Sequence, residues 1–421
     1  MNLLGLNELP APMRRSLILE AAYSISAGVV NGLVLLSQVT VLGSLQGDAA
    51  AVTVITAAMP GSAILQPIWA SAARRYRLQT LALVSGAFRC LPLLVIGLIT
   101  RPWPFTLAIV AYYIVSGPHS LAVPSLYKYN YADSHQGRII GILRMIQHGM
   151  AMPIMLGGAW WLDREPAAYQ LIYPLGGLIG LIGLVFYWLL RIPHDDPRER
   201  ARKSERPTWN NIRTVLREDH NFRLFQSTIF LTGAGFLMSR PIWLYLLRDE
   251  FRLSQVELTV LVMVMPFVLG ALTSPAWGLL IDRTSPVAGR VAFAWLGIFA
   301  YAALFLSFYA HWLWLAYLGA VLRGSVLGAA EVATTTGNLY FSVRRERAAL
   351  YESISSLFQG IRGLLMPFVG WLLFQEVHLF IFLVPTGLNL WSLVLALQLW
   401  RRDRAESPES AYVRRMSEAH D

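Results

Sequence analysis

The chain has 421 residues, of which 55% are hydrophobic and only 14% charged, and its mean hydropathy of +0.49 excludes an ordinary soluble domain of this size. Its net charge of +10 does not indicate a nucleic-acid partner, because the basic residues gather on alternate connections between apolar segments. A lone cysteine, Cys90, excludes an internal disulfide framework.

Twelve apolar segments are long enough to cross a bilayer, whose hydrocarbon core of about 30 Å needs roughly 20 helical residues. Lipid offers the backbone no hydrogen-bond partners, so we expect every span to be a helix. If the number of spans differs from twelve by one, we expect the difference near His311, where two spans meet. The spans are predicted at 16–44, 48–73, 78–100, 103–127, 138–162, 168–191, 221–247, 254–281, 288–310, 311–341, 348–374 and 377–400.

The Lys and Arg residues predict how these spans are oriented. With a cytoplasmic N-terminus, 26 of the 35 basic residues lie in cytoplasmic segments, five lie within spans, and four lie outside (Arg101, Arg164, Arg248 and Arg252). The positive-inside rule then predicts both termini in the cytoplasm, in a multi-pass protein of the cytoplasmic (inner) membrane. A surface for anionic lipid or an acidic partner is the alternative explanation of the basic run 198–206.

One long polar stretch divides the spans six and six. The expected parts are an N-terminal six-helix bundle over 1–191, a cytoplasmic linker over 192–220, a C-terminal six-helix bundle over 221–400 and a cytoplasmic tail over 401–421. Within the linker, Trp209, Ile212, Val215 and Leu216 share one helical face, which predicts a short amphipathic helix. This helix either lies in the membrane interface or is a plain linker.

The two halves repeat each other at nearly constant offsets. Three residues at the end of span 2 recur 208 positions later at the end of span 8, and two residues of span 5 recur 214 positions later in span 11. The matched sets are Pro67, Trp69 and Arg75 with Pro275, Trp277 and Arg283, and Gly149 and Pro153 with Gly363 and Pro367. Two repeated six-helix bundles with a midplane cavity are an architecture of transporters.

The most specific motif follows span 8 and reads Gly278-Leu-Leu-Ile-Asp282-Arg283. It is similar to the G-x-x-x-D-R signature that the major facilitator superfamily of secondary transporters carries after its second and eighth spans. The first-half copy, Ala70-Ser-Ala-Ala-Arg74-Arg75, keeps the basic residues but lacks the glycine and the aspartate. Over residues 14–400 the chain resembles this superfamily, which implies an all-α membrane fold of two pseudo-symmetric six-helix bundles. The resemblance assigns Gly278, Asp282, Arg283, Arg74, Arg75 and Arg144 to gating.

Five arginines lie inside predicted spans: Arg89, Arg144, Arg240, Arg323 and Arg362. A charge at the bilayer centre costs roughly 2.5–3.5 kcal/mol on insertion scales, so each requires a reason. In the superfamily, spans 1, 4, 7 and 10 line the cavity and spans 2, 5, 8 and 11 flank it. The resemblance therefore implies that Arg240, Arg323, Arg362 and His148 reach the substrate, and the planar donor fork of arginine favours carboxylate or phosphate. Static pairing with carbonyls or acids is the alternative.

Several further residues complete the predicted site. Glu331 is the main candidate for proton coupling, because burial disfavours a charged carboxylate, and Glu20 is a shallower candidate. For Glu331 a static interhelical ion pair is the alternative. Asn31 and Gln38 lie seven residues apart on one face of span 1 and, with Gln359 of span 11, are expected to orient a ligand or to join helices.

Together these features predict a secondary active transporter that moves a small solute by alternating access. We expect the solute to be an organic or phosphorylated anion, the coupling ion to be the proton, and the protein to be a monomer in the bilayer. No Walker-type, H-E-x-x-H or G-x-S-x-G sequence occurs, so we predict no enzyme activity, no cofactor and no metal. Efflux of lipophilic compounds is one alternative, because the segment 149–158 is similar to an exporter-type motif. A non-transporting membrane subunit or receptor is the other.

Overall fold

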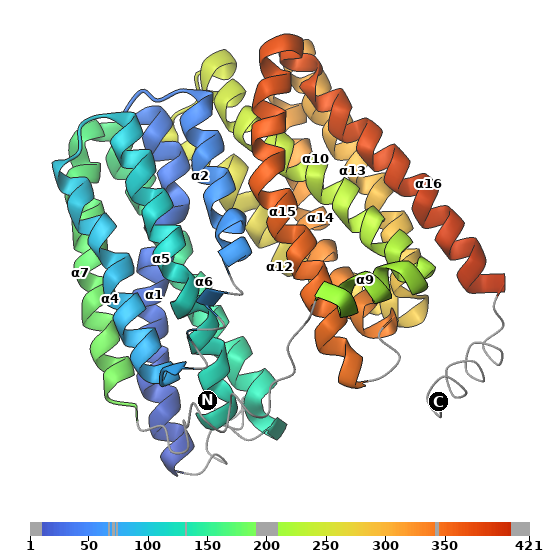
Figure 1. Ribbon diagram of the computed structural model, residues 1–421. Helices are drawn as coiled ribbons and strands as arrows, with labels where there is room; N and C mark the ends of the chain where they lie inside the picture. The colour runs from blue at the N-terminus through green and yellow to red at the C-terminus, as the bar shows by residue number, and fades with distance from the viewer. Residues whose placement is uncertain are drawn as a thin grey trace. The chain divides into compact units, whose positions relative to one another are not determined.

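The computed structural model describes residues 11–65, 68–69, 72, 75–130, 133–190, 209–341 and 345–405. Within these ranges the regular structure is helical and no strand occurs (Figure 1). Contacts divide the chain into two compact units. The first comprises Met1–Glu205 together with Ser254–Thr259, and the second comprises Arg206–Leu253 and Val260–Asp421.

The first unit is built from five long helices, one shorter apolar helix and a short helix that follows span 7. Its helices are α1 (Ala11–Gly43), α2 (Ala49–Gly61), η3 (Ser62–Leu65), α4 (Leu78–Val95), η4 (Ile96–Leu98), α5 (Pro102–Asn130), α6 (Asp133–Arg164), η5 (Pro166–Ala168), α7 (Tyr169–Trp188) and α11 (Gln255–Thr259).

The second unit begins with the amphipathic helix α9 and contains the remaining long helices. Its helices are α9 (Trp209–Glu218), α10 (His220–Phe251), η6 (Val260–Val264), α12 (Met265–Arg283), α13 (Pro286–Tyr309), α14 (Leu313–Phe341), α15 (Arg345–Val377), η7 (His378–Phe382) and α16 (Leu383–Ala405).

Each predicted span coincides with one or more of these helices, but hydropathy alone recognises fewer of them. In the part of the chain that the structure describes, nine segments are long and apolar enough to cross a membrane, and the last, Ser353–Asp403, includes most of both α15 and α16. The helix of span 2 is shorter, Ala49–Leu65. Gln147 and His148 lower the hydropathy of α6. The membrane fold is therefore confirmed, and the count of twelve stays a prediction.

The junction at His311 separates two helices. His311 adopts a left-handed conformation with φ of 53°, and the amide of Trp312 donates to the Ser307 carbonyl at 2.9 Å. This turn ends α13 and allows α14 to begin at Leu313.

The two units repeat one packing pattern. In the first, α1 packs against α6 and α7, α4 packs against α5 and α7, and α2 packs against α5. In the second, α10 packs against α15 and α16, α13 against α14 and α16, and α12 against α14. When the helices are numbered as spans 1 to 12, each packed pair of the second unit has the span numbers of a pair of the first unit plus six. The repeat seen in the sequence is thus a repeat of helix packing.

Small residues bring α1 and α6 close together. Gly28 and Gly32 lie one turn apart on α1, and a Cβ atom at either would come within 2.5 to 2.7 Å of a carbonyl oxygen of α6, that of Gln147 or Ala151. Such spacing of glycines allows two membrane helices to approach closely.

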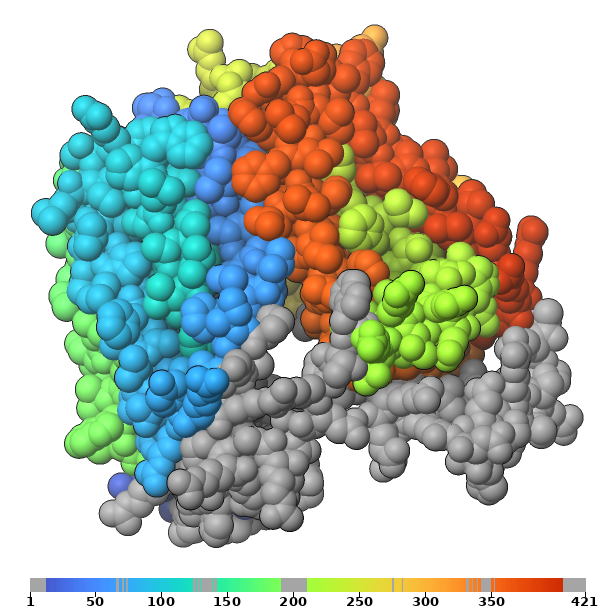
Figure 2. Space-filling model, in the orientation of Figure 1, coloured from blue at the N-terminus to red at the C-terminus, as the bar shows by residue number. Residues whose placement is uncertain are grey.

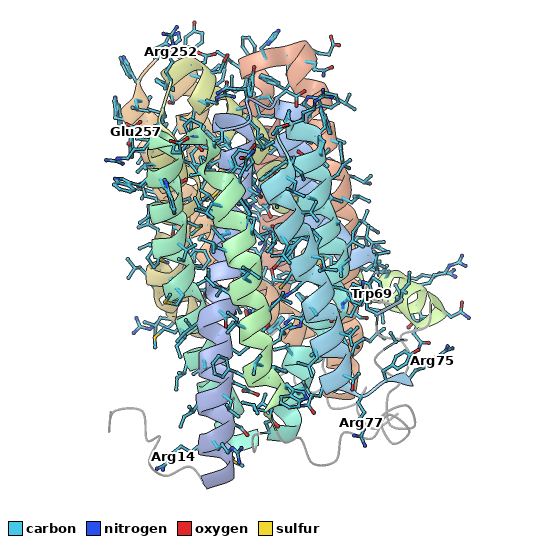
Figure 3. The ribbon with its side chains drawn as sticks, turned by 90° about the vertical axis from the view of Figure 1, so that its left-hand side faces the viewer. Arg14, Trp69, Arg75, Arg77, Arg252 and Glu257 are labelled. Atoms are coloured by element: carbon cyan, nitrogen blue, oxygen red, sulfur yellow. The ribbon has the colours of Figure 1, made fainter. Side chains whose placement is uncertain are left out.

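The ends of the first unit differ in charge. Arg14, Arg75 and Arg77 lie at one end, and Glu257 lies at the opposite end (Figure 3). We call the former the basic end. The positive-inside rule predicts that it faces the cytoplasm.

Helix α9 uses its apolar face for packing within the second unit. Val215 is 7% exposed and belongs to a cluster with Phe222, Ile229 and Tyr351, against which Ile212 and Leu216 pack. Figure 2 shows the outer side of α9 on the surface of this unit. The apolar face of the predicted amphipathic helix therefore contacts protein. The remainder of the linker, residues 192–208, lies outside the described residues.

Candidate functional site

The polar interior of the second unit is organised around α10. Its N-terminal half presents Thr228 and Thr232, one turn apart, towards α13. Arg290, the fifth residue of α13, is only 2% exposed and donates from Nε to Thr228 Oγ1 at 3.2 Å and from Nη2 to Thr232 Oγ1 at 2.8 Å. Its guanidinium carbon also lies 4.4 Å from the ring centre of Phe293, a cation–π distance.

Arg362 reaches the same part of α10 from α15. Its Nη1 donates to the Ile229 carbonyl oxygen at 2.6 Å, and its buried Nε has no hydrogen-bond partner among the described residues. A Cβ atom at Gly233 would lie 2.1 Å from the guanidinium carbon, so the guanidinium occupies space that any other residue at 233 would fill. Arg290 and Arg362 therefore both lie beside residues 228–233 of α10.

Arg323 lies against the C-terminal half of α10 in an aromatic enclosure. It is 2% exposed, and its Nη1 donates to Ser239 Oγ at 2.9 Å. The rings of Phe236, Trp243 and Tyr301 lie 4.5, 4.9 and 5.3 Å from its guanidinium carbon. Cation–π attraction therefore replaces much of the hydration that this charge loses on burial.

These three arginines share one electrostatic property. Among the described residues, no carboxylate forms an ion pair with Arg290, Arg323 or Arg362, whose contacts are hydroxyls, a carbonyl and aromatic rings. A buried charge without a counter-ion is unfavourable by several kcal/mol. The three guanidiniums therefore carry positive charge that no carboxylate among the described side chains balances.

A buried polar trio joins three helices of the same unit. Gln226 of α10 donates from Nε2 to Asn338 Oδ1 at 2.9 Å and to Ser355 Oγ at 2.7 Å, and the Ser355 hydroxyl lies 3.0 Å from both Gln226 Oε1 and Asn338 Oδ1. All three side chains are at most 4% exposed. The trio fixes the positions of α14 and α15 relative to α10.

In the first unit, a chain of hydrogen bonds runs through Tyr23. Arg89 Nη2 donates to Tyr23 Oη at 3.0 Å, and the Tyr23 hydroxyl is hydrogen-bonded to His119 Nε2. His119 Nδ1 lies 2.8 Å from the Ala82 carbonyl oxygen, which can only accept, so Nδ1 carries the proton and Nε2 accepts from Tyr23. The intramembrane Arg89 thus has a partner inside its own unit.

Glu20 lies one helical turn before Tyr23 on α1. It is 1% exposed and accepts a hydrogen bond from Asn130 Nδ2 at 2.8 Å. Its position near the basic end agrees with the shallow depth expected from the sequence, but its burial exceeds that expectation.

A second cluster in the first unit lies at the end opposite the basic end and caps α11. Asp163 accepts from the backbone amides of Gln255 (2.7 Å) and Val256 (3.0 Å), one through each carboxylate oxygen. Ser254 and Glu257 form a capping box, with Glu257 N donating to Ser254 Oγ at 3.2 Å and Ser254 N donating to Glu257 Oε2 at 2.8 Å. The free amides of the first turn are thereby satisfied.

The side chain of Gln255 strengthens this cap. Its Nε2 donates to the Leu162 carbonyl at 3.1 Å, and its Oε1 accepts from Ser44 Oγ at 3.4 Å. Directly after α11 the chain forms the π-helical η6, a rare geometry that often occurs at functional positions.

The remaining predicted binding residues differ in burial. Gln38 is 5% exposed, and its Oε1 has no hydrogen-bond partner among the described residues. Asn31, Gln359, His148 and Arg240 are half-buried. Arg240 and Arg362 lie in the same unit as Arg323, whereas His148, Asn31 and Gln38 lie in the first unit.

The predicted gating residues are described only in part. Arg144, Arg75 and Arg283 are exposed, and Gly278 is half-buried. Arg74 and the side chains of Asp282 and Glu331 lie outside the described residues. Their roles therefore stay predictions.

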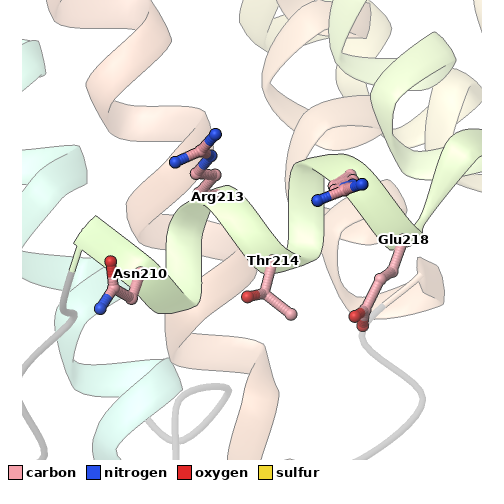
Figure 4. Close-up of a pocket in the computed structure, with 5 residues that line it drawn as sticks. Asn210, Arg213, Thr214 and Glu218 are labelled. Atoms are coloured by element: carbon pink, nitrogen blue, oxygen red, sulfur yellow. The ribbon is translucent and has the colours of Figure 1, made fainter.

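A shallow recess of about 560 Å³ runs along α9 (Figure 4). It is lined by Asn210, Arg213, Thr214, Arg217 and Glu218, all from one helix, and it opens to solvent. It lies apart from the buried arginines and has no enclosing wall. In the described part of the chain, no group of three or more His, Cys, Asp or Glu residues is arranged to hold a metal ion.

Two units that repeat one six-helix packing pattern, with charged residues in their interiors, define a transporter of the secondary type. Residues 19–370 match the family model described as Major Facilitator Superfamily, and the chain belongs to that superfamily. Its members are transporters. No curated protein matches the chain.

Solved structures show the same fold. The nucleoside transporter NupG, in a mutant form, is 14% identical, with 90% of this chain and 98% of that chain covered and a TM-score of 0.68. A bacterial homologue of the human lysosomal transporter Spinster, inward-facing and occupied, is 15% identical, with 96% and 99% covered and a TM-score of 0.64. A POT family transporter in complex with a thioalcohol-conjugated peptide is 10% identical, with 93% and 96% covered and a TM-score of 0.71.

Sequence reasoning missed Arg290. Counted from the predicted start of span 9, it lies at the third residue and was assigned to the cytoplasmic charges. The signal in the sequence is a pair of threonines, Thr228 and Thr232, which lie four residues apart on span 7 and offer two acceptors to a buried donor such as Arg290. Asp163 and the Gln226–Asn338–Ser355 trio were also missed, because their partners come from helices distant in sequence.

Proposed function

We propose that this transporter moves a small organic or phosphorylated anion across the cytoplasmic membrane by alternating access. The observation that carries the proposal is a set of three arginines in the interior of the second unit. Arg290 and Arg323 are buried, Arg362 is half-buried, and none has a carboxylate partner among the described residues. An anionic solute would supply the missing counter-charge, and arginine binds carboxylate and phosphate through paired donors.

Arg362 is the arginine best suited to direct contact with the solute. It is half-buried, whereas Arg290 and Arg323 are 2% exposed, and no described residue accepts a hydrogen bond from its Nε. Arg323 uses one N–H for Ser239 and stacks with three rings, so in this proposal it contributes mainly positive potential.

Proton coupling through Glu331 is part of the proposal. Burial of a carboxylate favours its neutral, protonated form. In this proposal Glu331 binds a proton on one side of the membrane and releases it on the other, so that the proton gradient drives solute movement. Glu331→Gln should abolish uptake driven by a pH gradient while solute exchange persists. Normal gradient-driven uptake by this variant would contradict the coupling role.

The test of the anion proposal is a thermal-shift screen of the purified protein against organic anions, sugar phosphates, organic cations, nucleosides and lipophilic compounds. Arg362→Ala is compared with the wild type, and Arg401→Ala, an exposed arginine at the end of α16, is the matched control. We expect an anion to stabilise the wild type and the control but not Arg362→Ala. Stabilisation by lipophilic compounds alone, unchanged in Arg362→Ala, would replace anion transport with efflux.

A further inference from the structure

We propose that the dianionic head of the transported solute, a phosphate monoester or an equivalent oxyanion, binds beside residues 228–233 of α10 between Arg362 and Arg290. The inference rests on the proposed function, because the occupant is the charged group of the transported anion. In this proposal Arg290 binds the solute, and the bound head group carries two negative charges rather than one.

Two threonines of α10 orient the Arg290 guanidinium. Thr228 Oγ1 donates to the Phe225 carbonyl at 2.7 Å and Thr232 Oγ1 donates to the Thr228 carbonyl at 2.9 Å, so both hydroxyls present lone pairs to the guanidinium. These lone pairs accept from Nε and Nη2, which fixes one edge of Arg290. Of five N–H donors, three are left, at the free end of the fork. A held guanidinium with a free donor pair is preorganised for bidentate binding of an oxyanion.

Arg362 has a donor that is open to a ligand. Among the described residues, its guanidinium donates to the Ile229 carbonyl, and its buried Nε has no partner. Buried donors normally have partners, so in this proposal an oxygen of the solute is the acceptor for this atom, for which the described residues supply none. Both Arg362 and Gly233 are half-buried, whereas Arg290 is 2% exposed, so the Arg362 side of the turn is the more accessible one.

The charges of Arg290 and Arg362 favour an occupant with two negative charges. Two guanidiniums beside one helical turn repel each other, and within the described chain neither forms an ion pair with a carboxylate. A monoanion leaves one positive charge uncompensated in a buried environment, whereas a dianion neutralises both. A phosphate monoester carries nearly two charges at neutral pH and three acceptor oxygens. It therefore matches the donors better than a monocarboxylate does.

The experiment measures ligand-dependent stabilisation of the full-length protein in detergent, with inorganic phosphate, glucose 6-phosphate, acetate, glucose and phosphatidic acid as probes. Four variants are compared with the wild type: Arg290→Gln, Gly233→Ala, Thr232→Val and the control Arg89→Gln. Gly233→Ala displaces the Arg362 guanidinium without changing any charge. Arg89→Gln removes a half-buried arginine from the other unit.

We expect phosphate and glucose 6-phosphate to stabilise the wild type, and acetate and glucose to have little effect. Arg290→Gln and Gly233→Ala should raise the half-saturating concentration about tenfold or more, the effect of losing one charge-assisted hydrogen bond. Thr232→Val should raise it less, and Arg89→Gln should leave it unchanged. If Arg290→Gln does not fold, Gly233→Ala and Thr232→Val carry the test.

Three outcomes would overturn the inference. Wild-type half-saturation by glucose 6-phosphate in both Arg290→Gln and Gly233→Ala would remove Arg290 from the site. Stabilisation by acetate as strong as by phosphate would remove the requirement for a dianion, and stabilisation by phosphatidic acid alone would replace the soluble solute with a lipid. The proposed function survives the first two results if Arg362→Ala still loses anion binding. The proposed function fails if no soluble anion stabilises the wild type.

Discussion

Asp163 offers the sharpest prediction of stability. Its carboxylate accepts two backbone amides of α11, from Gln255 at 2.7 Å and from Val256 at 3.0 Å, and Asp163→Ala removes both acceptors. Hydrogen bonds to charged groups contribute about 1.5–3 kcal/mol each when buried. Asp163 is exposed, so the lower range measured for helix caps, about 0.5–2 kcal/mol, is the appropriate scale. We expect a loss of about 1–2 kcal/mol in the local stability of α11.

Hydrogen–deuterium exchange of the peptide that contains residues 254–259 measures this loss directly. A change of about 1–2 kcal/mol corresponds to exchange roughly 5- to 30-fold faster at the amides of Gln255 and Val256. Glu165→Ala is the matched control, because Glu165 is also exposed and lies two residues from Asp163. Unchanged exchange at both amides in Asp163→Ala, or an equal increase in the control, would refute the capping role.

Further predictions concern packing inside each unit. In Gly297→Ala, the new Cβ atom would lie 2.3 Å from Asn389 Oδ1, so the melting temperature should fall by several degrees, whereas Gly149→Ala meets nothing within 4 Å and should have no such effect. Equal melting temperatures would refute the close approach of Gly297 to Asn389. Tyr23→Phe removes the hydroxyl that accepts a hydrogen bond from Arg89. This change should destabilise the protein by about 1–3 kcal/mol, because the Arg89 guanidinium loses a hydrogen-bond partner inside the unit. A melting temperature equal to that of the wild type would count against this network.

Much of the fold follows from the sequence because the hydropathy of each segment determines whether it spans the bilayer. A bilayer requires apolar helices of a set length, so hydropathy locates the spans, and repeated residues such as Trp69 and Trp277 reveal the repeat. The span ends are less predictable. The α1 helix begins at Ala11, five residues before the predicted span, because a helix can continue beyond the hydrocarbon core.

The site is less predictable because it depends on which way each side chain points. Arg323 and Arg362 are visible as charges inside spans, but the aromatic enclosure of Arg323 requires residues from both α10 and α13. Arg290 lies near a helix end, where an arginine is ordinarily solvated, and its burial follows only from the packing of α13 against α10. Sequence reveals a buried charge by its surroundings along the chain, and it does not reveal neighbours on other helices.

The most direct test of anion transport is current measured on a solid-supported membrane loaded with proteoliposomes. Rapid jumps of phosphate, glucose 6-phosphate, acetate or glucose are applied to wild-type protein, Arg362→Ala and the exposed-arginine control Arg401→Ala. We predict transient currents with the phosphorylated anions in the wild type and the control, and none in Arg362→Ala. Currents of equal size in Arg362→Ala, or no response to any anion in the wild type, would contradict anion transport through the arginines of the second unit.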